Sequence, residues 1–216
     1  MAATTIETPP DPVATYNLLR TPGSAADTFS IHQPNGATLH ASKKSHKLGS
    51  DELIISQDTT SDALVAAKLK ASSKKCEVKF DAKGDWQTVA SIDDLGTAYA
   101  VGKEGRVWRR LNKDSTGKIS ELSYGDMQLH ESTSSQGSPL AIYYLHSEGS
   151  RNAEGTVQIG QLDFSTDSLG REYELQALIA VLGLMECRRL DIRSRNLPLQ
   201  KGGVFPNSVP GPTGWK

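Results

Sequence analysis

The sequence predicts a mainly β protein: a closed antiparallel barrel of about twelve strands around one hydrophobic helix near the C-terminus. Two observations lead to this prediction. Short apolar or alternating segments recur along the chain at intervals of about ten residues, separated by Gly, Asn, Asp and Ser, which favour turns. Residues 177–185, in contrast, carry no polar side chain and lie where the strand pattern has stopped.

The strand-like segments are short, and no long amphipathic helices alternate with them, so a parallel doubly wound sheet is not expected. An antiparallel sandwich or barrel is typical of such spacing. The expected strands cover residues 14–20, 28–33, 37–44, 52–57, 63–72, 76–82, 86–93, 97–102, 106–112, 127–132, 139–147 and 156–164.

In the first half of the chain, turn signals and alternation mark the strands. The segment 28–33 runs into Pro-Asn-Gly at 34–36, which favours a tight turn. Apolar and polar residues alternate along 37–44, and 52–57 is rich in β-branched residues. The segment 63–72 is ambiguous, because its Ala, Leu and Lys residues also suit a helix.

In the second half, 76–82 and 86–93 alternate in the same way. A loop with glycines at both ends, 102–105, should join the two strands that flank it into a hairpin. Three further segments complete the set before the helix.

The predicted helix spans residues 172–190. The residues 165–168 (Ser-Thr-Asp-Ser) supply candidates for its N-cap, and Arg188 and Arg189 lie where cations favour a helix C-terminus. Apolar side chains wrap every face of this helix, so it must be buried on all sides.

A bilayer, a membrane surface and the protein interior are the three places that could bury this helix. The uncharged run 175–185 would be about 16 Å long, roughly half of a hydrocarbon core, so it is too short to span one. A helix lying on a membrane surface needs a polar face, which this run lacks. Burial inside a β domain remains, and a barrel can surround a helix where a sandwich covers one face only.

Composition and the chain ends suggest one domain with two tails. We expect a disordered leader at 1–14, a barrel domain at 15–192, and a flexible Pro- and Gly-rich tail at 193–216. No secretory signal pattern opens the sequence, so the cytoplasm is the expected location, with the nucleus and the membrane periphery left open. The formal net charge of −1 gives no global basic field, and nucleic acid is not an expected partner.

Known catalytic and cofactor motifs are missing from the sequence, so no catalytic residue, metal or cofactor is predicted. His130 and His146 could be cross-strand neighbours, but solvated strand histidines are the more common case. Cys76 and Cys187 are the only cysteines, and a disulfide between them is not expected. Cys187 ends the apolar segment, where burial should raise the pKa of its thiol.

Several segments together resemble known proteins. Short strands that close on a C-terminal apolar helix resemble the tubby-like barrel superfamily, which includes the tubby C-terminal domain, the phospholipid scramblases and the plant LURP-one-related proteins. A closer resemblance is to a family of small uncharacterised fungal proteins, defined by a domain of unknown function, that is thought to share this fold. The resemblance covers roughly residues 15–192 and rests mainly on GRVWRR (105–110), DMQLHES (126–132), PLAIYYLHS (139–147), TVQIGQLDF (156–164) and YELQALIAVLGLMECRR (173–189).

This resemblance suggests a function for two clusters of basic residues in the sequence. In tubby and its relatives, lysines and arginines on the barrel surface bind phosphoinositide head groups, so the resemblance implies that basic clusters here attract anionic lipids. A solvated loop and ordinary helix-capping charges are the plainer interpretation of the same residues. The candidate ligand-binding residues are Lys43, Lys44, His46, Lys47, Arg188, Arg189, Arg193 and Arg195.

The expected function is therefore a non-enzymatic intracellular binding module that recognises an anionic phospholipid head group or a protein. One alternative is a structural or regulatory protein-interaction domain without lipid binding. Another is a hydrolase whose site is assembled from scattered strand residues, for example from the carboxylate pairs Asp51-Glu52 and Asp93-Asp94. The sequence leaves the oligomeric state open.

Overall fold

The structure, a computed structural model, describes most of the expected barrel domain. The N-terminal ten residues and the tail beyond residue 194 lie outside the described part. The described residues are 11–20, 28–45, 51–59, 62–70, 74–81, 83–93, 98–101, 105–110, 126–131, 138–146, 156–166 and 169–194, with backbone alone for residues 45 and 192–194.

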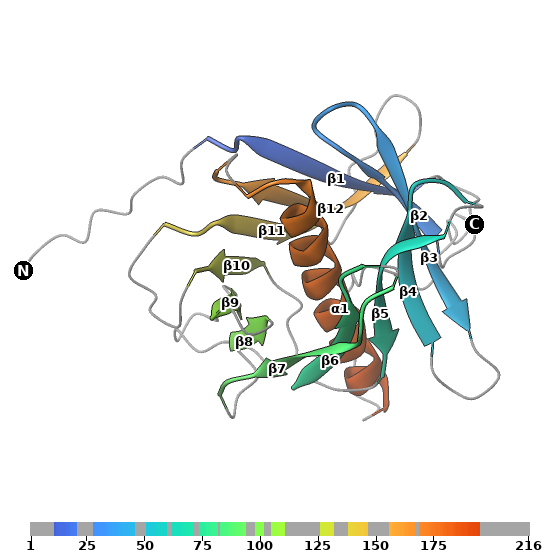
Figure 1. The fold of residues 1–216 in the computed structure, drawn as a ribbon, viewed down its shortest axis with the longest axis vertical. Helices are drawn as coiled ribbons and strands as arrows, with labels where there is room; N and C mark the ends of the chain where they lie inside the picture. The colour runs from blue at the N-terminus through green and yellow to red at the C-terminus, as the bar shows by residue number, and fades with distance from the viewer. Residues whose placement is uncertain are drawn as a thin grey trace, which may run out of the picture.

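Twelve antiparallel strands close into one barrel, and a single helix, α1 (Arg171–Ser194), runs through its centre (Figure 1). Neighbours in sequence pair with each other, and β1 pairs with β12 to close the barrel. The predicted fold class is thus confirmed. The strands are β1 (Ala14–Arg20), β2 (Thr28–His32), β3 (Thr38–Ser45), β4 (Asp51–Ser56), β5 (Ala63–Leu69), β6 (Lys75–Lys79), β7 (Gln87–Ser91), β8 (Ala98–Val101), β9 (Arg106–Arg110), β10 (Met127–His130), β11 (Ala141–Leu145) and β12 (Val157–Phe164).

Every expected strand is present, and most of the observed bounds differ from the expected ones by a few residues. Within the ambiguous segment 63–72, residues 63–69 form a strand, β5, which pairs with β4 and β6. The turn expected at 34–36 is also present: the Gln33 amide donates to the Ala37 carbonyl at 2.9 Å, and Gly36 has a φ of 80°. Glycine adopts this left-handed conformation at little cost, which explains its place in the turn.

Alternation along the strands decides which side chains face the helix. On β6, Cys76 and Val78 are buried in the core, whereas Glu77 and Lys79 between and beyond them are half-buried on the other face. This is the two-residue period of a strand with one face toward a core. The same period places the basic side chains discussed below.

The start of α1 differs from the prediction. The first helical hydrogen bond runs from the Glu174 amide to the Gly170 carbonyl at 3.1 Å, so Gly170 is the N-cap. The predicted caps at 165–168 are too early in the chain, because the Ser165 amide still donates to the Leu140 carbonyl and continues the strand pairing. At its other end the helix continues four residues beyond the predicted limit, to Ser194.

The middle of α1 is buried on all faces, as predicted. Each residue from Ala177 to Leu182 is at most 3% exposed. Strands surround the helix, and it packs most closely against β5 and β6. No helix in the described residues is both long enough and apolar enough to cross a membrane.

A hydrogen bond from β1 fixes α1 within the barrel near the N-terminus of the helix. The Tyr16 hydroxyl on β1 donates a short hydrogen bond to the Glu174 carboxylate, and the Tyr16 ring packs edge-on against Phe164 with 5.9 Å between centroids. Burial, followed by the hydrogen bond to Glu174, raises the pKa of Tyr16 well above its usual range. The phenol therefore stays protonated and keeps donating to the helix.

Gly183 lets α1 approach the barrel wall closely. A Cβ atom added at this position would lie 2.7 Å from the Cys76 Sγ and 2.8 Å from the Ala67 Cβ. Both distances are shorter than van der Waals contact, and the Ala67 Cβ cannot move without its backbone. The glycine is retained inside the helix because a larger residue would not fit.

We expect Gly183→Ala to lower the free energy of unfolding by about 1 kcal/mol, measured by urea denaturation. Overpacking usually costs about 1–3 kcal/mol, which exceeds the gain in helix propensity of at most about 1 kcal/mol. The penalty should shrink in a Cys76→Ala background, which removes one of the two obstructing atoms, so a double-mutant cycle would show the coupling. A variant more stable than the wild type would contradict the close packing.

Candidate functional site

Lysines gather at one end of the barrel, the end at which α1 terminates. Strand register brings them together: Lys44 on β3 pairs with Glu52 on β4, and Glu52 pairs with Lys68 on β5. The Cys187 thiol donates to the Lys68 carbonyl at 3.3 Å, which places the last turns of α1 at the same end. The lysines that the structure describes here, called the lysine rim below, are Lys43, Lys44, Lys68, Lys70, Lys74 and Lys75.

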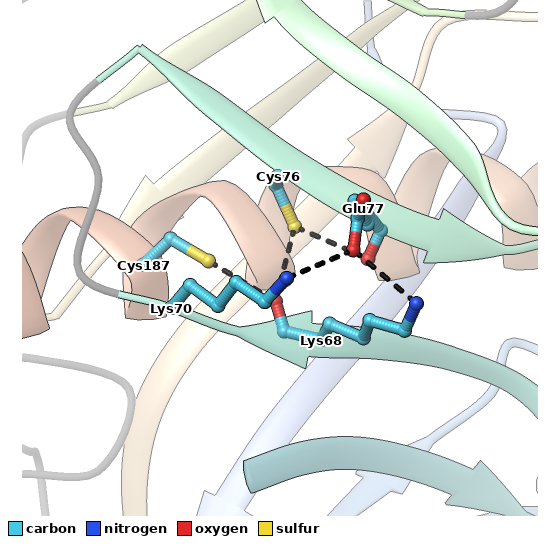
Figure 2. A network of polar contacts seen from close by, with 5 residues as sticks. All are labelled: Lys68, Lys70, Cys76, Glu77 and Cys187. Carbon is cyan, nitrogen blue, oxygen red and sulfur yellow. Dashed lines mark hydrogen bonds and ion pairs between the residues drawn. The ribbon is translucent and has the colours of Figure 1, made fainter. Parts of the chain in front are cut away.

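A row of alternating charges crosses four strands at this end. Glu77 follows Lys68 in the row, and its carboxylate lies 3.3 Å from the Lys68 Nζ and 3.4 Å from the Lys70 Nζ (Figure 2). The hydrogen bond from Lys68 is the main reason that the pKa of Glu77 is lowered. The Lys68 Nζ also lies 4.3 Å from the centroid of the Trp86 ring. Lys68 is therefore a structural member of the rim, held by a carboxylate and an aromatic ring.

The remaining lysines differ in how much charge they can offer to a ligand. Lys43 is bound to Asp51, with 2.9 Å between Nζ and Oδ2. Lys44 is exposed, and no ion pair joins it to another described residue. Lys70 has 60% of its side chain exposed. Lys74 and Lys75 are exposed at the start of β6, so together with Lys44 and Lys70 they form the outer part of the rim.

Positive charge exceeds negative charge along β3 to β6 at this end. The six lysines face three carboxylates on the same strands, those of Asp51, Glu52 and Glu77. The chain as a whole carries a formal net charge of −1, so this excess is local. Such a local excess attracts anions over a distance of about one Debye length, roughly 8–10 Å at moderate salt.

The candidate residues named from the sequence have different positions. Lys43 and Lys44 are part of the rim. The backbone of Arg193 belongs to the last turn of α1, and His46, Lys47 and Arg195 lie outside the described residues.

Arg188 and Arg189 are buried, at 4% and 3% exposure, contrary to the expectation of surface cations. The Arg189 guanidinium binds the Glu186 carboxylate, with 2.7 Å from Nη2 and 2.8 Å from Nε. The charge of Arg188 lies close to the Tyr99 side chain on β8. These two arginines end the apolar run but remain inside the barrel, where polar partners hold them.

Beside the lysine rim, the thiols of the two cysteines both contact the backbone carbonyl oxygen of Lys68 (Figure 2). The Cys76 and Cys187 sulfurs are 3.9 Å and 3.3 Å from the Lys68 carbonyl oxygen, and both thiols are free, as expected. Each thiol acts on the other: the nearby Cys76 thiol lowers the pKa of Cys187, and the nearby Cys187 thiol, together with burial, raises the pKa of Cys76. The Cys76 thiol lowers the pKa of Cys187 and outweighs burial, which acts to raise it as expected.

The other candidates for chemistry do not converge. His130 and His146 are not cross-strand neighbours, because the β10–β11 register places them toward opposite ends of the pair. His130 is buried, its Nε2 lies 3.3 Å from the Gln128 Oε1, and burial lowers its pKa. Asp51 is bound to Lys43. No group of three or more potential metal ligands occurs among the residues that the structure describes.

The sequence prediction missed the lysines on β5 and β6. The segment KLKASSKK (68–75) contains four of the six rim lysines, and its lysine density is the signal that could have identified them. Its significance depends on the register that sets it beside Lys43 and Lys44, which the spacing of residues in the sequence does not show.

Comparisons of the chain with protein-family models, with curated proteins and with solved structures find no match. The function is therefore inferred from the residues and contacts described above.

Proposed function

We propose that this chain is a non-enzymatic binding module that attaches to anionic phospholipid head groups through the lysine rim. The observation that carries the proposal is the convergence of two lysine clusters, separated in sequence, on one end of the barrel. The resemblance to tubby-like proteins, including the fungal family named above, favours the same class of ligand.

The charges available at the rim are sufficient for such attachment. A lysine close to an anionic membrane surface contributes about 1 kcal/mol of binding free energy. The four outer lysines, Lys44, Lys70, Lys74 and Lys75, would therefore contribute at most about 4 kcal/mol at low salt, since Lys70 also lies beside the Glu77 carboxylate, and this corresponds to weak and reversible binding. Arg188 and Arg189 are left out of this surface because they are buried.

The proposal is tested by sedimentation of the protein with vesicles of phosphatidylcholine, with and without phosphatidylserine or a phosphoinositide. We expect binding to the anionic vesicles that disappears as salt is raised. The double variant Lys44→Glu with Lys70→Glu should weaken it by about 30-fold or more, since the loss of two positive charges alone costs about 2 kcal/mol.

A matched control reverses the same number of charges at the other end of the barrel. Arg171 starts α1 and Lys83 lies beyond the far end of β6, and both are exposed. Arg171→Glu with Lys83→Glu should leave vesicle binding largely unchanged. Equal loss in both double variants would reduce the effect to net charge, and no binding to anionic vesicles at low salt would overturn the proposal and favour a protein partner.

A further inference from the structure

A second candidate site is a cavity of about 690 Å³ at the other end of the barrel. It lies between the first turns of α1 and strands β6 to β10, where β6 and β8 end and β7 and β9 begin. Its volume falls within the range of about 300–1,000 Å³ that is typical of small-molecule sites. On β6 the lysine rim lies at the opposite end of the strand, and Trp86, whose ring contacts Lys68, borders both sites.

Aromatic rings from four parts of the chain line this cavity. Phe80 follows β6, Trp86 precedes β7, Trp108 is on β9, and Tyr173 is on the first turn of α1. Rings of this kind bury the apolar body of a ligand and prefer flat or extended molecules that can pack against their faces.

Arg106 supplies a positive charge to the same cavity. Its guanidinium carbon lies 3.9 Å from the centroid of the Tyr173 ring, so the ring holds the side chain in place. A guanidinium stacked by its face donates hydrogen bonds from its edge, in the fork geometry that matches a carboxylate. The edge of the Arg106 guanidinium, with its several N–H donors, therefore matches an anionic group with two oxygens.

Trp108 adds a neutral donor. Its side chain is fully buried and lines the cavity, and its Nε1 has no hydrogen-bond acceptor among the described residues. A buried N–H group without an acceptor is uncommon, because leaving it unsatisfied is unfavourable. Arg106 and Trp108 are two residues apart on β9 and face the same side of the strand. A ligand oxygen near Arg106 would thus also be near this donor.

We propose that this cavity binds a small apolar carboxylic acid, with its carboxylate on Arg106 and its apolar body among the rings of Phe80, Trp108 and Tyr173. Recognition would be by one charge-assisted contact and by burial of the apolar body, which is the usual composition of a small-molecule pocket. The inference does not depend on the lysine rim.

Isothermal calorimetry with naphthoate and with its neutral amide, naphthamide, tests the proposal on the wild-type protein. The two probes share the same rings and differ in the charged group. We expect naphthoate to bind about tenfold to a hundredfold more tightly than naphthamide, the range for a hydrogen bond to a charged group. Equal binding of the two probes, or no binding of naphthoate at millimolar concentration, would overturn the proposal.

Variants of the protein then test whether Arg106 binds the carboxylate of naphthoate. Arg106→Gln should lower the affinity for naphthoate by about tenfold or more and remove the preference over naphthamide. Arg171→Gln removes the same charge from an exposed position two residues before Tyr173 and should leave the affinity unchanged. The same loss in both variants would exclude Arg106 as the specific partner. Lys44→Glu with Lys70→Glu should leave naphthoate binding intact, whatever its effect on vesicles.

Discussion

Leu182→Asp is expected to abolish folding of the domain. Leu182 is fully buried near the middle of α1, with core side chains on every side. The substitution removes an apolar side chain, at a cost of about 2–5 kcal/mol, and adds a buried carboxylate without a partner. The total approaches or exceeds the whole stability of a typical domain, about 5–15 kcal/mol. Circular dichroism should show no cooperative thermal transition.

Two control variants show whether the loss of folding comes from burying a charge. One changes residue 182 without adding a charge, and the other adds the charge at an exposed position. Leu182→Met keeps the volume and polarity and should cost less than about 1.5 kcal/mol. Ile92→Asp introduces the same charge at a position that is 47% exposed and should leave the transition nearly unchanged. A folded and soluble Leu182→Asp protein would show that α1 does not lie on the barrel axis.

Glu186→Gln should produce the second large effect, a loss of about 3–5 kcal/mol in the free energy of unfolding. Glu186 is fully buried and its carboxylate binds the buried Arg189 guanidinium at 2.7 Å. The substitution preserves shape but leaves the arginine charge in the interior without its counter-charge. Urea denaturation at neutral pH measures the loss.

The control for charge at the same helix is Glu172→Gln. Glu172 is exposed in the first turn of α1, and its contribution through the helix dipole should be at most about 1 kcal/mol. Adding Arg189→Met to Glu186→Gln should restore part of the lost stability, because the buried Arg189 charge is then removed as well. If the double variant is less stable than Glu186→Gln alone, Arg189 has a stabilising partner other than Glu186.

The barrel itself could be predicted because its evidence is local. Alternation identifies strands such as the one predicted at 37–44 one at a time, and turn residues separate them. The uniform apolar surface of 177–182 then requires a surrounding wall, and the strands are the only elements able to supply it. Neither inference needs to know which strands are neighbours.

The candidate site could be predicted only in part, because it depends on which strands and side chains become neighbours in the folded barrel. Lys43 and Lys44 stand out in the sequence, but Lys70, Lys74 and Lys75 join them through the register of β3 to β6. Arginines at a helix C-terminus normally reach solvent, whereas Arg188 and Arg189 stay inside because the barrel extends past them. The cavity beside Arg106 likewise requires the packing of α1 against β9, which no local pattern contains.

Closure of the barrel limits how a protein could bind to it. Each of the twelve strands pairs with a neighbour on both sides, so in the described residues the sheet has no edge strand. A peptide therefore cannot bind by adding a strand to the sheet, the mode that open sheets offer to extended ligands. Within the described residues, a lipid, metabolite or protein partner would be recognised by side chains at the two ends of the barrel and on its outer face.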